Sequence, residues 1–400
     1  MKRVVIIGGG YSGIYALREL IKNENIHITL IDKHTYHNLQ PEVYDFIANK
    51  ANIADVTIDL TTLCLGFDHP FLEYKNLNIS NIDFQSQILY SKEDETLSYD
   101  YLIIAAGSRT FFPESIKGLK NTDDIKKLHK AIYFKQSFEN QIFNKIQDEA
   151  KKCDKTHIAV IGAGLSGVEI ASEMAYYSQE LLKRGSFACK NIEISLISSS
   201  STILPGFNKK LMRMAHNRLK ELNIHIITNT KMQSADKEYL YLSNGTKIIY
   251  SFIVFTGGIE PSNMATSLEV AKNEKGQLLV NEYLQLTDYQ NVFAIGDIAN
   301  IKNPKGETMP QNVTVARDSG IIAGKNILAL IKDKALKKCD PRLEGILIAL
   351  GGKYAVCDLY GIVKFKGYLA YVVKQFAFFA YKFPLLKYIK NGYKKLHNLH

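Results

Sequence analysis

Two short glycine-rich segments hold the residues of this chain that are best placed to do chemistry. Residues 8–13 read Gly-Gly-Gly-Tyr-Ser-Gly and residues 162–167 read Gly-Ala-Gly-Leu-Ser-Gly, so both fit the pattern G-x-G-x-x-G. In that pattern the first glycine allows a tight turn, the second lets the backbone approach a pyrophosphate, and the third lets a helix pack closely on a strand. The chemistry indicated is the binding of two dinucleotides, each with its pyrophosphate on free N–H groups at a helix N-terminus.

The first segment stands between elements that would position it. The apolar run Val4–Ile7 predicts a buried strand and Ile14–Leu20 predicts a helix. A second predicted strand, Ile26–Ile31, ends at Asp32, 19 residues after Gly13, where an acidic side chain accepts a hydrogen bond from a ribose 2′-OH. A glycine-rich turn beside an unrelated surface aspartate is the alternative, but it leaves the register of these elements unexplained. The residues predicted to bind the first nucleotide are Gly8, Gly10, Tyr11, Ser12, Gly13, Asp32 and Lys33.

The second segment lies between the same kinds of element, with one difference. Ile158–Ile161 predicts a strand, Val168–Leu182 a long helix, and Ile192–Ile197 the next strand. The acidic residue expected after that strand is replaced by Ser198, and no arginine is near it in the sequence to bind a 2′-phosphate. The preference between NAD-type and NADP-type nucleotides is therefore open, as is a Rossmann fold without a ligand. The residues predicted to bind the second nucleotide are Gly162, Gly164, Leu165, Ser166, Gly167 and Ser198.

Two dinucleotide sites in one chain imply electron transfer between two cofactors. One would be a tightly held FAD and the other an exchangeable NAD(P)H, and the cofactors would carry the chemistry. The 400 residues suggest two or three domains, and a hydrophobic fraction of 46% is ample for their cores. The five cysteines form no C-x-x-C pair and have no metal-ligand spacing, so we expect no structural disulfide, no dithiol site and no metal.

Four further motifs lie along the chain. Residues 34–41, His-Thr-Tyr-His-Asn-Leu-Gln-Pro, and residues 291–297, Asn-Val-Phe-Ala-Ile-Gly-Asp, are two of them. The others are residues 99–107, which end in Ala-Ala-Gly, and residues 257–261, Gly-Gly-Ile-Glu-Pro. In this order the motifs resemble the FAD-dependent pyridine nucleotide-disulfide oxidoreductase-like flavoproteins with two dinucleotide-binding domains. The resemblance implies that Gly107, Gly296 and Asp297 also contact FAD and that Gly258 also contacts NAD(P)H.

Within those flavoproteins the chain resembles the type II, non-proton-pumping NADH:quinone oxidoreductases over nearly its whole length, including residues 343–371. The glutamate of that family that matches Glu169 lies near the contact between nicotinamide and flavin. The resemblance implies that Glu169 positions the nicotinamide or takes part in proton transfer; a glutamate that complements a helix dipole is the alternative. The family's A-Q-x-A-x-Q motif has Thr314 and Asp318 in place of its two glutamines here, so the quinone type is open. Gln311 and Thr314 are predicted to lie on the quinone side.

The C-terminal segment carries the whole net charge of +10. From residue 332 on, 14 basic residues stand against four acidic ones, with aromatic residues between them. Residues 367–383 are apolar nearly all round, with Lys374 in the middle of the run, and Pro384 is expected to start a second helix. Basic faces beside aromatic and leucine faces are typical of helices that lie on anionic bilayers. A dimer contact and a nucleic-acid arm are the alternatives, and no run is long and apolar enough to cross a membrane.

These features predict an α/β protein with two Rossmann-like three-layer domains, for FAD and NAD(P), and a C-terminal membrane-associated helical segment. We expect a discontinuous FAD domain at residues 1–113 and 287–330, the NAD(P)H domain at residues 114–286, and the amphipathic membrane segment at residues 331–400. The expected activity is hydride transfer from NAD(P)H to FAD and transfer of two electrons to a quinone, at the cytoplasmic face of the cell membrane. No nucleic-acid partner is expected, and a homodimer is left open. The alternatives are a sulfide:quinone oxidoreductase, for which Cys357 would need a partner cysteine, and a slow flavin redox sensor.

Overall fold

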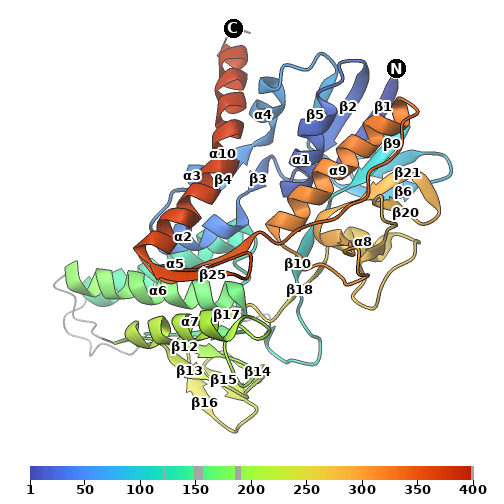
Figure 1. The fold of residues 1–400 in the computed structure, drawn as a ribbon. Coiled ribbons are helices and arrows are strands. Elements are labelled where there is room, and N and C mark those ends of the chain that lie inside the picture. The colour runs from blue at the N-terminus through green and yellow to red at the C-terminus, as the bar shows by residue number, and fades with distance from the viewer. Residues whose placement is uncertain (120–121, 148–155, 185–190, 398–400) are drawn as a thin grey trace.

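The computed structural model describes residues 1–119, 122–147, 156–184 and 191–397. Two parallel sheets, each with helices packed on it, form the body of the molecule (Figure 1). The first sheet has the strand order β20-β21-β9-β1-β2-β5, and only β20 runs antiparallel to its neighbour. Its strands are β1 (Lys2–Ile7), β2 (Ile26–Ile31), β5 (Leu72–Lys75), β9 (Tyr101–Ile104), β20 (Gln285–Leu286) and β21 (Tyr289–Ala294).

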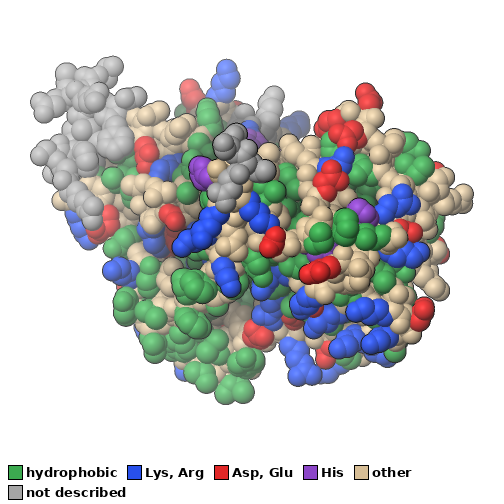
Figure 2. Space-filling model, turned by 90° about the horizontal axis from the view of Figure 1, so that it is seen from above, with side chains coloured by type: hydrophobic (Ala, Val, Ile, Leu, Met, Phe, Trp, Pro, Cys, Tyr) green, Lys and Arg blue, Asp and Glu red, His purple; other side chains and the backbone are tan. Residues whose placement is uncertain are grey.

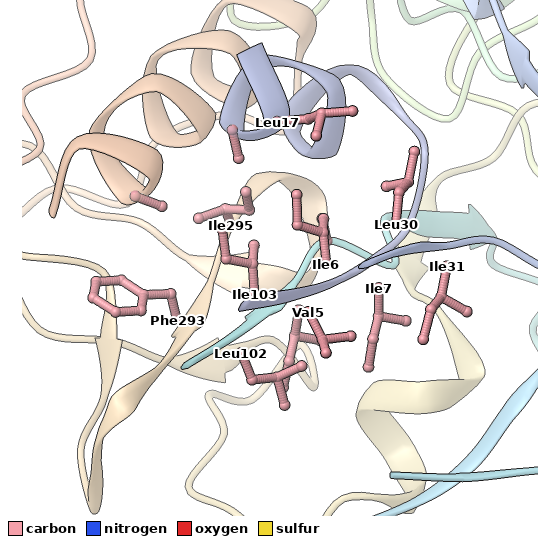
Figure 3. Close-up of a cluster of buried hydrophobic side chains, with 14 of the residues drawn as sticks. Val5, Ile6, Ile7, Leu17, Leu30, Ile31, Leu102, Ile103, Phe293 and Ile295 are labelled. Carbon is pink, nitrogen blue, oxygen red and sulfur yellow. The ribbon is translucent and has the colours of Figure 1, made fainter. Parts of the chain in front are cut away.

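The core of this sheet follows from the apolar runs seen in the sequence. Val5, Ile6 and Ile7 of β1 lie among side chains of β2, β9 and β21 (Figure 3). Two helices pack on the sheet and on each other, α1 (Tyr11–Leu20) and α9 (Val313–Ile331). They approach so closely that a Cβ atom on Gly320 would lie 2.3 Å from the Ser12 carbonyl oxygen. Residues from both segments of the predicted discontinuous FAD domain therefore share one core. The domain boundaries at residues 113, 287 and 330 stay predictions.

The second sheet repeats the design with the strand order β13-β12-β11-β17, all parallel. Two antiparallel strands, β10 (Ser108–Thr110) and β18 (Ile259–Pro261), pair where the chain leaves the first sheet and returns from the second. The predicted strands at residues 158–161 and 192–197 are confirmed. The elements of this part are α5 (Leu128–Gln147), β11 (Thr156–Ile161), α6 (Leu165–Arg184), β12 (Ile192–Ile197), α7 (Lys209–Glu221), β13 (His225–Ile227) and β17 (Phe252–Phe255).

Shorter helices and strands complete the parts of the molecule around the two sheets. A three-stranded antiparallel sheet lies on each part, β6-β7-β8 on the first and β14-β15-β16 on the second. Between β2 and β5 the chain forms the pair β3–β4, the 3-10 turn η1 and three short helices. Their bounds are β3 (Tyr36–Asn38), η1 (Gln40–Glu42), α2 (Val43–Ile47), α3 (Ile53–Val56), β4 (Thr57–Asp59), α4 (Leu60–Gly66), β6 (Ile79–Asp83), β7 (Ile88–Ser91), β8 (Thr96–Ser98), β14 (Met232–Ala235), β15 (Tyr239–Leu242), β16 (Lys247–Ile249), α8 (Asn263–Ser267), β19 (Leu278–Leu279), η3 (Gly296–Ile298) and β22 (Ala299–Asn300).

The C-terminal segment differs from the sequence prediction in two ways. It begins with an antiparallel sheet, β23 (Gly345–Ala349), β24 (Ala355–Leu359) and β25 (Val363–Gly367), before any helix. The two expected helices are one helix, α10 (Tyr368–His397), with Pro384 inside it. Proline removes one helical hydrogen bond and crowds the preceding turn, at a cost of about 3 kcal/mol or more. Packing of α10 on α4 offsets this cost, because Leu385 is fully buried and Gly392 lies against the Thr62 backbone.

No helix in the described part of the chain is both long and apolar enough to cross a bilayer.

Candidate functional site

The first glycine-rich loop has no room for a side chain at Gly8 or Gly13. Gly8 has φ +113°, and a Cβ atom there would lie 2.3 Å from the Ala105 carbonyl oxygen. A Cβ atom on Gly13 would lie 1.8 Å from the Gly8 carbonyl oxygen, so helix α1 rests directly on the turn. A Cβ atom on Gly10 would meet no described atom within 4 Å, and no described side chain caps α1 there. The loop therefore presents free backbone N–H groups to an open space, as a pyrophosphate requires.

Asp32 is held beside this loop by the backbone. Its carboxylate accepts hydrogen bonds from the Gly9 N–H at 2.7 Å and from the His34 N–H at 2.8 Å. Burial raises the pKa of Asp32, and the two hydrogen bonds oppose that rise. The carboxylate is thus oriented at the end of β2, where a ribose hydroxyl is expected, while the neighbouring Lys33 is exposed.

The motif at residues 291–297 is far from the first loop in the sequence but lies against it in the fold. A Cβ atom on Gly296 would lie 2.6 Å from the Ser12 hydroxyl oxygen. The Asp297 carboxylate accepts a hydrogen bond from the Ser108 hydroxyl at 2.5 Å, and its carbonyl oxygen accepts one from the Gln311 side chain at 2.8 Å. Gly107 borders open space, like Gly10. The residues predicted for FAD from three distant segments are therefore neighbours.

Lys126 joins this group, although nothing in the sequence pointed to it. Its ammonium donates a hydrogen bond to the Ser108 hydroxyl at 2.6 Å. Burial lowers the pKa of Lys126, while Asp297 and Asp124 oppose that effect. Three lysines follow one another closely at residues 126, 127 and 130, and only the tertiary structure distinguishes the half-buried Lys126 from its two exposed neighbours.

The second glycine-rich loop repeats the geometry of the first. Gly162 has φ +108°, and a Cβ atom there would lie 2.7 Å from the Thr256 carbonyl oxygen. A Cβ atom on Gly167 would lie 1.8 Å from the Gly162 carbonyl oxygen. Cβ atoms on Gly164 and Gly258 would meet no described atom within 4 Å. This loop likewise leaves open space for a pyrophosphate at the start of α6, where Leu165 is exposed and Ser166 half-buried.

The end of β12 contains no acid, as the sequence indicated, but an arginine does lie nearby. Ser198 is buried; its hydroxyl donates to the Thr202 carbonyl at 2.9 Å and accepts from the Ser200 N–H at 3.2 Å. Beyond it, Arg213 and His216 of α7 border a hollow of about 290 Å³. Ser201, Thr202, Ile203, Met212 and Thr228 complete this hollow. The expectation that no arginine is close is therefore wrong, because α7 folds back over the end of β12.

Glu169 is buried just after the first turn of α6 and does not stand free as a helix-dipole partner. Its carboxylate accepts a hydrogen bond from the Ala349 N–H at 2.9 Å and lies 3.7 Å from the Lys374 ammonium. Burial raises the pKa of Glu169, against the opposing effect of Lys374. Lys374 itself is buried, so it does not lie on the lipid-facing surface that the sequence suggested. The β23 backbone and α10 thus both reach the predicted site of nicotinamide binding.

On the predicted quinone side, Asp318, which replaces one of the family's glutamines, has a charged partner. The Asp318 carboxylate accepts a hydrogen bond from Arg317 at 2.8 Å, and Arg317 also pairs with Glu344 at 3.1 Å. The charge of Asp318 is therefore balanced by Arg317. Thr314 is half-buried on the first turn of α9, next to the loop that holds Gln311.

A histidine that the sequence reasoning did not single out lies between the first loop and α10. His37 is buried, and its Nε2 atom lies 2.8 Å from the Tyr381 hydroxyl. Its ring also meets Tyr11 edge to face, with centroids 4.7 Å apart. Burial lowers the pKa of His37 to about 3, so the ring is neutral at physiological pH.

The described cysteines are all buried. Cys64, Cys339 and Cys357 are buried and unpaired, and burial raises the pKa of their thiols to about 12, 12 and 11. Cys153 and Cys189 lie outside the described residues. Over the described ranges, no group of three metal-binding side chains comes together.

Comparison with known proteins agrees with this geometry. The type II NADH:quinone oxidoreductase of Haemophilus influenzae is 27% identical over 95% of this chain and 92% of its own length. Demethylphylloquinone reductase NdbB of Synechocystis is 26% identical over 96% and 92%. The resemblance predicted from the motifs is confirmed by these relatives.

Solved structures share the fold over nearly the whole chain. NDH2 of Plasmodium falciparum in complex with NADH superposes with a TM-score of 0.85 at 17% identity, over 98% of this chain and 97% of that one. The sulfide:quinone oxidoreductase of Aquifex aeolicus superposes with a TM-score of 0.79 at 20% identity, over 98% and 92%. Residues 2–320 match the family described as pyridine nucleotide-disulphide oxidoreductase. The chain belongs to the pyridine nucleotide-disulphide oxidoreductase family.

Proposed function

We propose that this protein is an FAD-dependent oxidoreductase that takes hydride from NADH and passes two electrons to a quinone. The observation that carries the proposal is the pair of glycine-rich loops with the same geometry, each bordering open space where Gly10 and Gly164 lie. FAD, when bound, supplies the chemistry: it accepts a hydride and releases two electrons. The relatives from Haemophilus influenzae and Synechocystis, which carry quinone reductase names, support quinone as the acceptor.

The chain's own residues bind and orient the two nucleotides. The backbone at Gly8, Gly10 and Gly13 holds the FAD pyrophosphate, and Asp32 accepts a hydrogen bond from the adenosine ribose. Asp297 holds the ribityl–phosphate region. The loop at residues 162–167 and Gly258 hold NAD(P)H, and Glu169 lies where the two nucleotides meet. Gln311 and Thr314 border the quinone side.

The sulfide:quinone alternative depends on cysteines that can reach a flavin. Cys357 lies in β24, fully buried, with its thiol pKa raised by burial to about 11. A thiol that stays protonated is a poor nucleophile. No observation on the described residues favours this alternative over the quinone reductase, nor the slow redox sensor.

The face of α10 that points away from the body supports attachment to an anionic membrane. Large exposed hydrophobic side chains line it, and Figure 2 shows hydrophobic side chains gathered at the lower left of the view from above, with basic ones beside them. Such a surface places the active site where a lipid-soluble quinone can enter, and we propose the cytoplasmic face of the cell membrane. The exposed side chains are Tyr368, Leu369, Val372, Phe376, Phe379, Phe383, Leu386 and Tyr393, and exposed lysines nearby are Lys387, Lys390 and Lys394.

The catalytic proposal is tested by titrating the purified flavoprotein without oxygen. NADH should bleach the flavin fully, sulfide should not, and a short-chain soluble quinone should restore the colour at a rate that matches steady-state turnover. FMN or no flavin after reconstitution would refute the FAD assignment. Bleaching by sulfide would favour the sulfide:quinone alternative, and quinone reoxidation too slow for turnover would favour the sensor.

The membrane proposal is tested with the double substitution Phe376→Ser and Phe379→Ser. Burying a phenylalanine contributes roughly 1.5–3 kcal/mol, so binding to vesicles of anionic lipid should weaken more than tenfold. High salt, which shortens the Debye length to roughly 3 Å at 1 M, should release only part of the unaltered protein. The control is Tyr133→Ser, which removes an equally exposed aromatic from α5. Unaltered protein that does not co-sediment with anionic vesicles would contradict the proposal.

A further inference from the structure

A hollow of about 200 Å³ lies where helices α1, α9 and α10 meet, outside the two glycine-rich loops. The three helices lie next to one another in Figure 1, and ring contacts of Tyr381 with Tyr11 and Tyr15 join α10 to α1. Of the six residues that border the hollow, two are cationic, two are tyrosines, one is acidic and one is apolar. They are Tyr15, Arg18, Glu19 and Lys22 of α1 and the turn after it, Ile321 of α9, and Tyr388 of α10.

The acidic residue of the hollow already has a cationic partner. The Glu19 carboxylate lies 2.6 Å from the Lys22 ammonium, and the Glu19 side chain is 14% exposed against 60% for Lys22. A Cβ atom on Gly324 would lie 2.7 Å from the Glu19 Cβ atom, so the base of this side chain is packed against α9. The ion pair leaves the hollow with one net positive charge, which is that of Arg18.

Arg18 is half-buried, and no carboxylate in the described ranges lies within 4 Å of its guanidinium. The guanidinium lies over the Tyr15 ring, 5.4 Å from the ring centroid. Stacking of this kind uses the flat face of the guanidinium and leaves the N–H groups along its edge free to bind an anion. A cation in the last turn of α1 also complements the helix dipole. The dipole explains the charge of this residue, but not its stacking on a ring inside a hollow.

The hollow lies next to the face of α10 that we propose contacts a membrane. Tyr388, which borders the hollow, is two residues from the exposed Leu386 and five from the exposed Tyr393. With a rise of 1.5 Å per residue, these two positions are about 3 Å and about 8 Å from Tyr388 along the helix axis. Lys387 and Lys390, on either side of Tyr388 in the chain, are exposed as well. An anion bound in the hollow would therefore lie beside apolar side chains, as the head group of a lipid does.

We propose that this hollow binds the phosphate group of an anionic phospholipid and that Arg18 recognises it. This inference rests on the proposed membrane attachment and adds one defined lipid site to the general attraction of the exposed lysines. A guanidinium can donate two parallel hydrogen bonds to two oxygens of one phosphate. A half-buried cation has also lost part of its hydration, and a bound phosphate replaces that lost stabilisation. The choline of a zwitterionic lipid would bring another cation toward Arg18 and Lys22, so the hollow favours a head group without a cation.

The test uses the FAD-loaded enzyme and a lipid that stays monomeric in solution, dihexanoyl phosphatidylglycerol below its micelle concentration. Calorimetric titration should show saturable binding at one site. Arg18→Gln should weaken this binding by roughly tenfold or more, as the loss of charge-assisted hydrogen bonds does. Arg18→Lys should have an intermediate effect, since an ammonium keeps the charge but not the two parallel donors. Dihexanoyl phosphatidylcholine and inorganic phosphate, titrated in parallel, should both bind more weakly than the anionic lipid.

Lys390→Gln is the matched control, because it removes one exposed positive charge of α10 that does not border the hollow. It should weaken co-sedimentation with phosphatidylglycerol vesicles by roughly fivefold, as the loss of one surface charge does, and leave the titration with the monomeric lipid unchanged. Arg18→Gln should weaken both. Visible absorbance should show unchanged FAD content in each variant. If Arg18→Gln loses FAD, the titration of Arg18→Lys decides the question.

Three results would contradict the proposals, each in a different way. Binding of the monomeric lipid that survives substitution of Arg18, or no such binding by an enzyme that co-sediments with anionic vesicles, would overturn this inference. Inorganic phosphate that binds as tightly as the lipid would assign the hollow to a free anion and overturn the lipid assignment. An unaltered enzyme that does not co-sediment with anionic vesicles would instead refute the proposed membrane attachment.

Discussion

The two nucleotide loops have the same glycine geometry, yet the residues around them differ. Around the first loop, Asp32 accepts a hydrogen bond from the loop backbone, and the Ser108 hydroxyl links Asp297 to Lys126 from separate segments. Around the second, the end of β12 offers Ser198, whose hydroxyl is used within its own turn. The same loop geometry can therefore serve a tightly held nucleotide or an exchangeable one. The segments around the loop set the number of contacts that must break when the nucleotide leaves.

The largest expected effect comes from the matched substitutions Gly13→Ala and Gly167→Ala. Each new Cβ atom would lie 1.8 Å from a backbone carbonyl oxygen, so each should destabilise its own loop by roughly 3 kcal/mol. Gly13→Ala should yield protein without FAD. Gly167→Ala should keep FAD but lose reduction by NADH. Visible absorbance and anaerobic titration report the two outcomes, and loss of FAD from both variants would show that the two sites are not independent.

A smaller effect should distinguish groups that hold FAD from groups that act between the nucleotides. Asp32→Asn removes the negative charge at the ribose position and should weaken FAD binding about tenfold, with the reduction rate of the remaining holoenzyme unchanged. Glu169→Gln should retain FAD and slow turnover by roughly 10–100-fold, because its buried carboxylate faces Lys374 and not the FAD loop. FAD retention after dialysis and turnover per flavin are the measurements. FAD loss in Glu169→Gln would contradict the assignment.

The smallest effect should appear at the exchangeable site. Ser198→Glu should sharpen the preference for NADH, since a carboxylate repels the 2′-phosphate of NADPH. Arg213→Ala should raise KM for NADPH about tenfold and leave that for NADH unchanged, if the hollow bordered by Arg213 and His216 receives that phosphate. Ratios of kcat/KM for the two nucleotides provide the readout. Lys209→Ala, an exposed cation on the same helix, is the control. Improved use of NADPH by Ser198→Glu would show that the ribose lies elsewhere.

Local patterns predicted the nucleotide loops because their geometry depends on a few adjacent residues. Gly8 and Gly162 occupy backbone conformations that side chains rarely adopt, and each is followed by a glycine at which a helix meets the turn. The same reasoning failed at Pro384, since the packing of α10 on α4, which sustains the helix, involves residues far apart in the chain. It also missed β23–β25, whose short strands gain their stability from pairing with one another.

The fold class, the two loops and the family could all be recognised from the sequence, because spacing within a strand–turn–helix unit is a local steric requirement. The position of Arg213 near the end of β12, the contact of Lys126 with Ser108, and the burial of Lys374 against Glu169 all depend on how distant segments fold together. Charge and protonation depend on burial and on neighbours brought from distant segments. Glu169 and Lys374 lie far apart in the chain, and no local pattern connects them; the fold alone makes them an ion pair.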